Sequence, residues 1–320
     1  MKIECTKADI LESVQSVQGA VSGKTTLAIL NNVLLEAEGD KVTVTATDFE
    51  IILQHSFKAK VVEKGSITVP AKKLNDILKE LSGAELKLEV SEKNTVTIKS
   101  QKAVFKLMGL PKDEFPVPKQ EKAEKSAKIG AILLREMIAK TIFAVSSDET
   151  RQVLNGVFVN AEKNHAVFVA TDGHRLSYVR KELKFKEPFS ATIPPKAMVE
   201  VEKAASKIEG DVDFEMTQNR VVFKFGDFKV HSKLIEGQFP NYQQIISKEL
   251  AQTVTFEKTV FLDAFKRTSV MAVDKTNSVK MKFEKGKLTV SATAQEIGEA
   301  EEEIDAGYSG DEITIAYNVK

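Results

Sequence analysis

One pattern of residues is written three times along this chain of 320 residues, and this internal repeat restricts the possible folds more than any other feature. Each copy contains two runs of alternating apolar residues, and the second run ends in an Ala-Thr pair. The pairs fall at 46–47, 170–171 and 292–293, so they recur after 124 and then 122 residues. A repeat of this length predicts tandem copies of one domain of ordinary size.

Two further landmarks recur at the same spacing as the first two Ala-Thr pairs. Pro70 and Pro194 each precede a stretch whose apolar residues recur at helical spacing. Phe-Pro pairs follow at 115–116 and 239–240. Agreement of several landmarks at one period makes a chance match improbable, so we treat the copies as domains.

The register also predicts where the domains begin and end. We expect domains at 1–122, 123–249 and 250–320, with a solvated, Lys- and Glu-rich linker over 117–128. The segment 313–318 matches the segments that precede the helix-opening prolines of the other copies. By this internal template the third copy is expected to be incomplete.

Each copy is expected to fold in the order strand, helix, strands, helix, strands. Short hairpin connections predict antiparallel pairing, and two helices would cover one face of a sheet in an α+β arrangement. Thr6 followed by Asp9 predicts the start of the first helix, which apolar spacing extends to residues 22–23. The same pattern predicts a helix over 134–145 in the second copy. In the third copy we expect the first helix to carry these apolar residues: Val260, Phe261, Ala264 and Phe265.

Composition limits the classes of function. Lys plus Arg and Asp plus Glu both number 46, so the net charge is zero and any nucleic-acid contact needs a local basic surface. Cys5 is the single cysteine, so no internal disulfide can form, and we expect it to be a buried strand residue. The N-terminus lacks a signal-peptide pattern, and no segment approaches the ~20 apolar residues of a membrane span. These features predict a soluble, cytoplasmic protein.

Two alternatives from other classes have to be weighed. Asp48, Asp172 and His174 could be imagined as metal ligands of a phosphoesterase. The third copy has no equivalent acid, however, and the four histidines lack ligand-like spacing; no phosphate-binding glycine loop or nucleophile elbow occurs. We therefore expect no catalytic residue, no metal and no cofactor. The other alternative is a repeat scaffold that binds no nucleic acid.

The repeats contain stretches that resemble one known family over the whole chain and in the right order. They include TLAILNNVLLEAEGDKVTVTATDFEI, LPKDEFP, LNGVFVNA, VATDGHRLS, SKLIEGQFPNY and IAYNVK. The chain resembles the bacterial DNA polymerase III beta subunits, the sliding clamps. That resemblance implies three clamp-type domains per subunit in a head-to-tail homodimeric ring, with helices lining the hole and sheets outside. It also implies a processivity factor without catalytic activity that encloses double-stranded DNA. Implied partners are the DNA polymerase III catalytic subunit, the clamp loader and other clamp-binding-motif proteins.

A clamp must bind DNA without sequence specificity, so its contacts should be to phosphates. Basic side chains on exposed helix faces would supply them, namely Lys72, Lys73, Lys79, Arg135, Lys140, Lys196, Lys203, Lys207, Lys266 and Arg267. Lys24 and Arg151 are loop positions that resemble DNA contacts of the family. Gln152 and Val153 follow Arg151 where the family often has aromatic residues.

The resemblance also implies a hydrophobic pocket for the short clamp-binding peptide of partner proteins. The matching positions are Leu154, Thr171, Gly173, His174, Arg175, Leu176, Pro240, Ile245 and Asn318. Asp172 would shape the turn at the edge of this pocket. The family completes the pocket with residues from its extreme C-terminus, and Asn318 matches the last of its positions in this chain.

A homodimer interface is implied in the same way. An apolar centre with opposite charges around it would suit such a contact. On the first domain the positions are Lys102, Phe105, Lys106 and Leu107. On the third domain of the partner they are Val270, Met271, Glu296, Glu299, Glu301 and Glu302.

Overall fold

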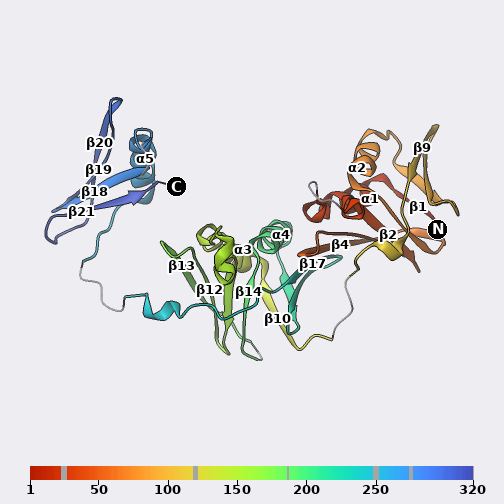
Figure 1. The fold of residues 1–320 in the computed structure, drawn as a ribbon, viewed down its shortest axis with the longest axis horizontal. Helices are drawn as coiled ribbons and strands as arrows, with labels where there is room; N and C mark the ends of the chain where they lie inside the picture. Colours follow the sequence, from red (N-terminus) through yellow and green to blue (C-terminus); the bar gives the residue numbers. More distant parts are fainter. Residues whose placement is uncertain (23–26, 118–121, 186, 248–251, 274–276, 320) are drawn as a thin grey trace. The chain divides into compact units, whose positions relative to one another are not determined.

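The computed structural model describes residues 1–22, 27–117, 122–185, 187–247, 252–273 and 277–319 (Figure 1). Contacts divide the chain into two compact units, Met1–Phe239 and Pro240–Lys320. The first unit contains the first two repeats, and the second unit contains the third. Each unit is therefore considered by itself.

The first repeat alternates strands and helices in the predicted order. Its elements are β1 (Lys2–Thr6), α1 (Lys7–Ser16), η1 (Gln18–Ala20), η2 (Ala28–Asn31), β2 (Asn32–Glu38), β3 (Lys41–Thr47), β4 (Ile51–Lys58), β5 (Lys60–Glu63), β6 (Gly65–Pro70), α2 (Ala71–Glu80), β7 (Glu85–Val90), β8 (Thr95–Ser100), β9 (Ala103–Met108) and η3 (Lys112–Glu114). Thr6 accepts a hydrogen bond from the Asp9 amide, which confirms the predicted helix start.

The second repeat has the same element order apart from the short strand β5 and the 3-10 turn η3. Its elements are β10 (Lys125–Gly130), α3 (Ala131–Ala139), η4 (Ile142–Ala144), η5 (Glu149–Leu154), β11 (Val157–Ala161), β12 (His165–Thr171), β13 (Leu176–Glu182), β14 (Phe189–Ile193), α4 (Pro195–Ala205), β15 (Asp211–Met216), β16 (Arg220–Phe225) and β17 (Phe228–Lys233). The repeat read from the sequence is thus a repeat of fold.

The second unit contains the corresponding first part of a repeat. Its elements are η6 (Tyr242–Gln244), α5 (Lys258–Ser269), β18 (Ser278–Glu284), β19 (Lys287–Ala294), β20 (Gly298–Asp305) and β21 (Ile313–Asn318). The four strands form one sheet in the order β20-β19-β18-β21, and α5 packs against it.

An eight-stranded sheet joins the first two repeats. Its strand order is β10-β15-β16-β17-β4-β3-β2-β6, and β17 of the second repeat pairs with β4 of the first, with Val230 opposite Leu53. A five-stranded sheet, β5-β1-β7-β8-β9, and a four-stranded sheet, β13-β12-β11-β14, complete the unit. The observed strand pairs are antiparallel, as predicted.

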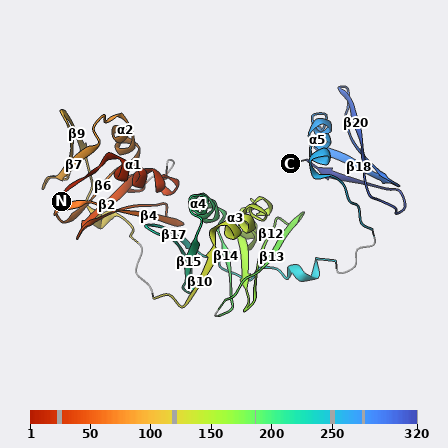
Figure 2. The same ribbon diagram turned by 180° about the vertical axis from the view of Figure 1, so that it is seen from behind.

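Helices pack in pairs against these sheets. Figures 1 and 2 show α1 beside α2 in the first repeat and α3 beside α4 in the second. Their inner faces are fully buried, with Ile10 and Leu74 in the first pair and Leu134 and Val201 in the second. Cys5 lies buried in β1, as predicted, and burial raises the pKa of its thiol to about 12.

Three predictions of local structure were wrong in extent. Helix α1 ends at Ser16 and α3 at Ala139, and each is followed by a separate 3-10 turn. Thr141 donates its hydroxyl to the Met137 carbonyl, a side-chain bond that replaces further helical bonding. Residues 125–128 of the predicted linker form part of β10. On α5, Val260 is exposed, whereas Ala264 is buried in the core of the second unit.

Among the described residues, no helix combines the length and apolar character needed to cross a membrane.

Candidate DNA and partner-binding surfaces

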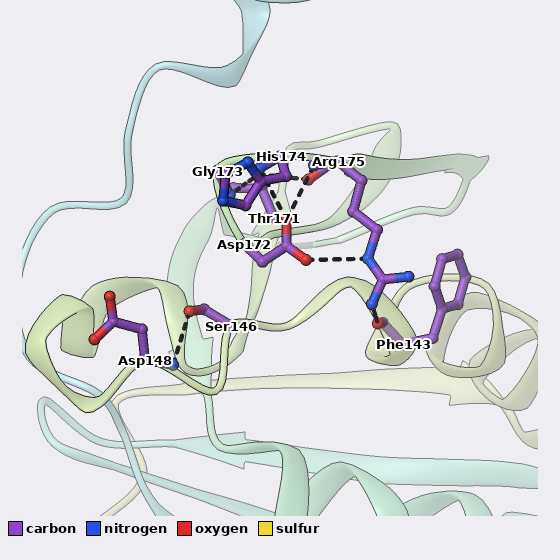
Figure 3. A network of polar contacts seen from close by, with 8 residues as sticks. All are labelled: Phe143, Ser146, Asp148, Thr171, Asp172, Gly173, His174 and Arg175. Carbon is purple, nitrogen blue, oxygen red and sulfur yellow. Dashed lines mark hydrogen bonds and ion pairs between the residues drawn. The ribbon is translucent and has the colours of Figure 1, made fainter. Parts of the chain in front are cut away.

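The residues Thr171–Arg175 form a turn that closes on itself at the end of β12 (Figure 3). The Thr171 hydroxyl donates to the Arg175 carbonyl at 2.6 Å and accepts from the Gly173 amide at 3.1 Å. Asp172 Oδ1 accepts from the amides of His174 and Arg175 at 2.9 and 3.0 Å. We call this segment the Thr171 turn. Its own hydrogen bonds fix its backbone, so it can present side chains at a defined edge.

Arg175 ties the Thr171 turn to the segment after α3. Its Nε lies 3.1 Å from Asp172 Oδ2, one terminal nitrogen donates to the Phe143 carbonyl at 2.9 Å, and the guanidinium lies 5.8 Å from the centre of the Phe143 ring. Partial burial opposes ionisation of Asp172, but hydrogen bonds from His174 and Arg175 outweigh it and lower the pKa of this carboxyl. Asp172 is therefore an ionised structural anchor.

The first repeat reproduces the Thr171 turn bond for bond. In the Thr47 turn, Thr47–Ile51, the hydroxyl donates to the Ile51 carbonyl at 2.9 Å and accepts from the Phe49 amide at 3.1 Å. Asp48 Oδ1 accepts from the amides of Glu50 and Ile51 at 3.0 and 2.9 Å. The third repeat has no equivalent acid and makes a plain hairpin turn, in which the Ile297 amide donates to the Ala294 carbonyl.

In both turns, the carboxylates that a metal site would need already bind cationic side chains of the same chain. Asp48 Oδ2 accepts from Lys196, and Asp172 Oδ2 accepts from Arg175. In the part of the chain that is described, no three His, Cys, Asp or Glu side chains are grouped so that they could hold a metal. The geometry thus gives no support to the phosphoesterase alternative at Asp48, Asp172 and His174.

The first unit brings several predicted pocket residues to one place. Leu154, at the end of η5, is buried, and its carbonyl accepts from the Ser146 amide at 3.0 Å. Thr171 is buried and Leu176 is half-buried on the neighbouring turn and strand. A Cβ at Gly173 would lie 2.8 Å from a terminal nitrogen of Arg151, so this predicted DNA contact borders the same turn. Pro240, Ile245 and Asn318 belong to the second unit, where all three are exposed.

Six of the predicted DNA contacts are exposed cations with no carboxylate within 4.0 Å among the residues that the structure describes. They are Lys72, Lys73 and Lys79 on α2, Arg135 on α3, Lys207 just after α4, and Lys266 on α5. Helix α2 carries three of them. Lys24 lies outside the described residues.

The other five predicted DNA contacts are paired with acids of the same chain. The pairs are Lys140 with Glu136, Arg151 with Asp148, Lys196 with Asp48, Lys203 with Glu200, and Arg267 with Glu302. Glu136 also binds Lys181, and hydrogen bonds from the two lysines lower its pKa to about 2. Three of the five pairs are local, at spacings of three or four residues, whereas the partners of Lys196 and Arg267 are distant along the chain and could not be predicted from local spacing.

The predicted dimer residues lie on strands at sheet edges or in exposed segments. Strand β9 is the last strand of the five-stranded sheet. On it Phe105 and Leu107 pack partly on the core, while Val104 and Met108, which the sequence analysis did not select, are 57% and 68% exposed. Lys102 and Lys106 are exposed.

In the second unit, β20 is also an edge strand. Glu299 and Glu301 are exposed on it, and Glu296 lies in the preceding turn with φ 67°. Val270 is exposed, whereas Met271 packs partly on the core of its own unit. Glu302 binds Arg267 within the unit, so this acid already has a partner.

Comparison with known proteins finds one family along the entire chain. Residues 1–119, 128–241 and 243–320 match the N-terminal, central and C-terminal domain models of the DNA polymerase III beta subunit. The chain is 33% identical to the beta sliding clamp of Synechocystis sp., over 100% of this chain and 88% of the relative. It is 34% identical to that of Treponema pallidum, over 99% and 87% of the two chains.

Solved structures agree with these relatives. The DNA polymerase III subunit beta of Pseudomonas aeruginosa matches with a TM-score of 0.95 at 30% identity, over 100% of this chain and 88% of that one. The DNA polymerase sliding clamp of Bacillus subtilis matches with a TM-score of 0.95 at 30% identity, over 99% and 87%.

Proposed function

Because the chain belongs to the DNA polymerase III beta subunit family, the beta sliding clamps, we infer that it is a DNA sliding clamp. It acts as a processivity factor and not as an enzyme. The observation that carries this conclusion is the match of three successive clamp domains, in order, to the three repeats of one fold. We further propose that two copies close a ring around double-stranded DNA in the cytoplasm, without a cofactor.

The domains proposed are 1–122, 123–249 and 250–320. Family matches that end at residue 119 and resume at 128 support the first boundary. The shared sheet explains why contacts group the first two domains into one unit: β17 pairs with β4 across the boundary. Such a pairing would hold adjacent domains of the ring at a fixed angle.

We propose that DNA is contacted through phosphates by the helix cations. The six cations without a carboxylate partner would contribute most, because their charge is not already balanced within the chain. Three of them lie on α2, one on α3, one after α4 and one on α5. The paired cations and Lys24 would add weaker or local contacts.

We propose that partner proteins bind at the Thr171 turn. Apolar anchors beside a rigid polar edge suit capture of a short peptide. Leu154, Leu176 and the stem of Arg175 would bind apolar side chains, with Gly173 and His174 at the edge. Pro240, Ile245 and Asn318, which belong to the second unit, are proposed to take part in peptide binding as well. The polymerase catalytic subunit and the clamp loader would then compete for this site.

The homodimer is proposed to form between β9 of one copy and the β20 region of the other. Both are edge strands with unpaired backbone groups, which favours extension of a sheet across the contact. Lys102 and Lys106 would face Glu296, Glu299 and Glu301 of the second copy, around an apolar centre at Phe105, Leu107, Val270 and Met271.

A topological test separates a clamp from a scaffold that does not bind DNA. The chain is loaded onto a nicked circular plasmid with a clamp loader and ATP, and the mixture is passed through a sizing column in high salt. A clamp should elute with the circle and dissociate when a single cut linearises it. Equal retention on linear DNA would contradict encirclement, and no retention on either form would favour the scaffold.

A further inference from the structure

Helix α2 of the first repeat and helix α4 of the second repeat differ in how their lysines are balanced. On α2, Lys72, Lys73 and Lys79 have no carboxylate within 4.0 Å among the described residues, whereas on α4 both Lys196 and Lys203 are paired. Pairs between solvated side chains contribute little and exchange readily. What matters is therefore whether the two acids that hold the α4 lysines are solvated or fixed by the fold.

Glu200 is fixed by packing. The residue is buried, with 8% of its surface exposed, and its carboxylate lies against the backbone of Gly19 in the first repeat. A Cβ at Gly19 would come within 2.4 Å of Glu200 Oε1, so a larger residue at this position would force the carboxylate to move. The same oxygen accepts from Lys203 Nζ at 2.7 Å. Burial between the two repeats therefore restricts the movement of this carboxylate.

Asp48 is fixed by hydrogen bonds. Two amides of the Thr47 turn hold its Oδ1, and the other oxygen binds Lys196, which comes from the next repeat. Only 12% of the side chain is exposed. In the second repeat the equivalent oxygen of Asp172 binds Arg175 of its own turn. The acid of the turn in the first repeat therefore pairs with a helix of the second repeat, whereas the equivalent acid in the second repeat pairs within its own turn.

Lys207 provides a comparison within the same surroundings. Lys203 and Lys207 border one hollow of about 640 Å³, together with Glu12, His55 and Glu200. Lys203 is bound by Glu200, while Lys207 has no carboxylate within 4.0 Å among the described residues. The two lysines thus differ in pairing more than in location.

We propose that Glu200 and Asp48 are positioning residues that hold the α4 lysines in internal ion pairs. These ion pairs reduce the contribution of α4 to DNA binding. A lysine already bound to a fixed carboxylate must give up that partner to meet a phosphate, so it releases few additional counterions. Phosphate contact in the first unit then falls mainly on α2. This inference rests on the proposed DNA-binding role of the helices.

The experiment measures how the affinity for a short DNA duplex depends on salt. Fluorescence anisotropy at several NaCl concentrations gives the slope of log K against log[salt], which steepens by about 0.9 for each added phosphate contact. Glu200→Gln keeps the shape of the side chain but removes its charge, and it should bind DNA more tightly with a slope steeper by about that amount. Glu202→Gln is the matched control, since Glu202 lies on the same helix with no ion pair among the described residues. The control should shift affinity less and leave the slope unchanged.

The possible outcomes distinguish this inference from the proposed function. Equal effects of Glu200→Gln and Glu202→Gln would show a simple effect of net charge and overturn the inference. If Glu200→Gln does not fold, Lys203→Gln should lower the slope by less than half as much as Lys207→Gln, and equal losses would overturn the inference. A shallower dependence of log K on log[salt] in Lys72→Gln would show that the helix cations contact phosphates, and so would support the proposed DNA binding independently of Glu200. Insensitivity of every variant, Lys72→Gln included, would overturn both.

Discussion

Phe49 in the first repeat occupies the position that Gly173 occupies in the second, and both have a positive φ, 74° and 89°. Such a backbone conformation is unfavourable for a residue with a large side chain. The first repeat keeps it because the hydroxyl of Thr47 and the carboxylate of Asp48 fix the turn around it. The turn is therefore a property of the repeated fold, and the side chains placed on it are what differ between the repeats.

The threonine hydroxyl of each turn should stabilise the fold through its hydrogen bonds. Thr171→Val and Thr47→Val each remove a hydroxyl that donates to one backbone group and accepts from another, in a buried position. Each should lower the free energy of unfolding by about 1–3 kcal/mol, because backbone groups lose their partners. Chemical unfolding monitored by circular dichroism measures the change.

The third repeat supplies the control for this prediction. Thr293 is exposed and its hydroxyl makes no hydrogen bond among the described residues, so Thr293→Val should change stability by less than about 0.5 kcal/mol. Equal losses in all three variants would mean that the hydroxyls do not fix the turns.

Removing one exposed apolar side chain should weaken binding of partner peptides without affecting the fold. Ile245 is 66% exposed, so Ile245→Ser should leave the melting temperature nearly unchanged. If it anchors the peptide, affinity for a clamp-binding-motif peptide should fall about tenfold or more, as for a hot-spot residue. Isothermal titration calorimetry measures this affinity without a label on either molecule.

Ile132 on α3 provides the matched control, since it is 68% exposed and has the same side chain. Ile132→Ser should bind the peptide as the unchanged chain does. Equal affinities for Ile245→Ser and Ile132→Ser would count against a contribution of Ile245 to the pocket.

The junction between β4 and β17 should weaken in mild acid. His231 lies on β17 with Nε2 3.1 Å from Gln54 Oε1 on β4, and burial lowers its pKa to about 4. The unfolded chain takes up this proton near pH 6.5 and the folded chain only near pH 4. Stability linked to His231 is thus complete above pH 6.5 and is lost as the pH falls toward 4, by at most on the order of 3 kcal/mol.

His231→Gln tests this dependence. Thermal unfolding between pH 7 and 4.5 should show a smaller loss of stability in the variant, because the titrating group is absent. Carboxylates titrate in both proteins, so their contribution cancels when the two pH profiles are compared. Parallel loss in both proteins would assign the acid sensitivity to other groups, such as His55, whose pKa is also lowered by burial.

Charge reversal on β9 should weaken the proposed dimer. Lys106→Glu would place a negative charge opposite the acidic segment of the second copy, and the dissociation constant should rise more than tenfold at low salt. Sedimentation velocity over a range of concentrations measures it. Lys93→Glu, an exposed turn residue with no ion pair among the described residues, is the control. An equal effect of both variants would point to net charge instead of a contact at β9.

The sequence predicted the elements of the fold well because most of them follow from local patterns. Alternation and helical spacing located the strands and helices, and the period of the repeat placed them in domains. Strand β10 was missed because its ladder to β15 uses backbone groups, such as Ile129 opposite Val212, and its side chains carry charges typical of a linker. The joining of two repeats through β17 and β4 was likewise invisible, since no local pattern links residues so far apart.

The same limit applies to the candidate sites. Individual cations could be placed on helix faces from their spacing, but whether a cation is free depends on its neighbours in space. Lys196 and Asp48 are 148 residues apart in the sequence, and the burial of Glu200 depends on Gly19 in another repeat. The positions of candidate residues could thus be predicted, whereas their electrostatic state could not.

We propose that copies of one fold unit encircle duplex DNA with their helices toward it. Electron cryo-microscopy of the chain loaded on DNA tests this most directly. We expect a closed ring of two copies with the duplex through its centre, α1 to α4 facing the phosphates and the sheets outside. A duplex bound on the outer sheets, or two copies that form no ring, would contradict it.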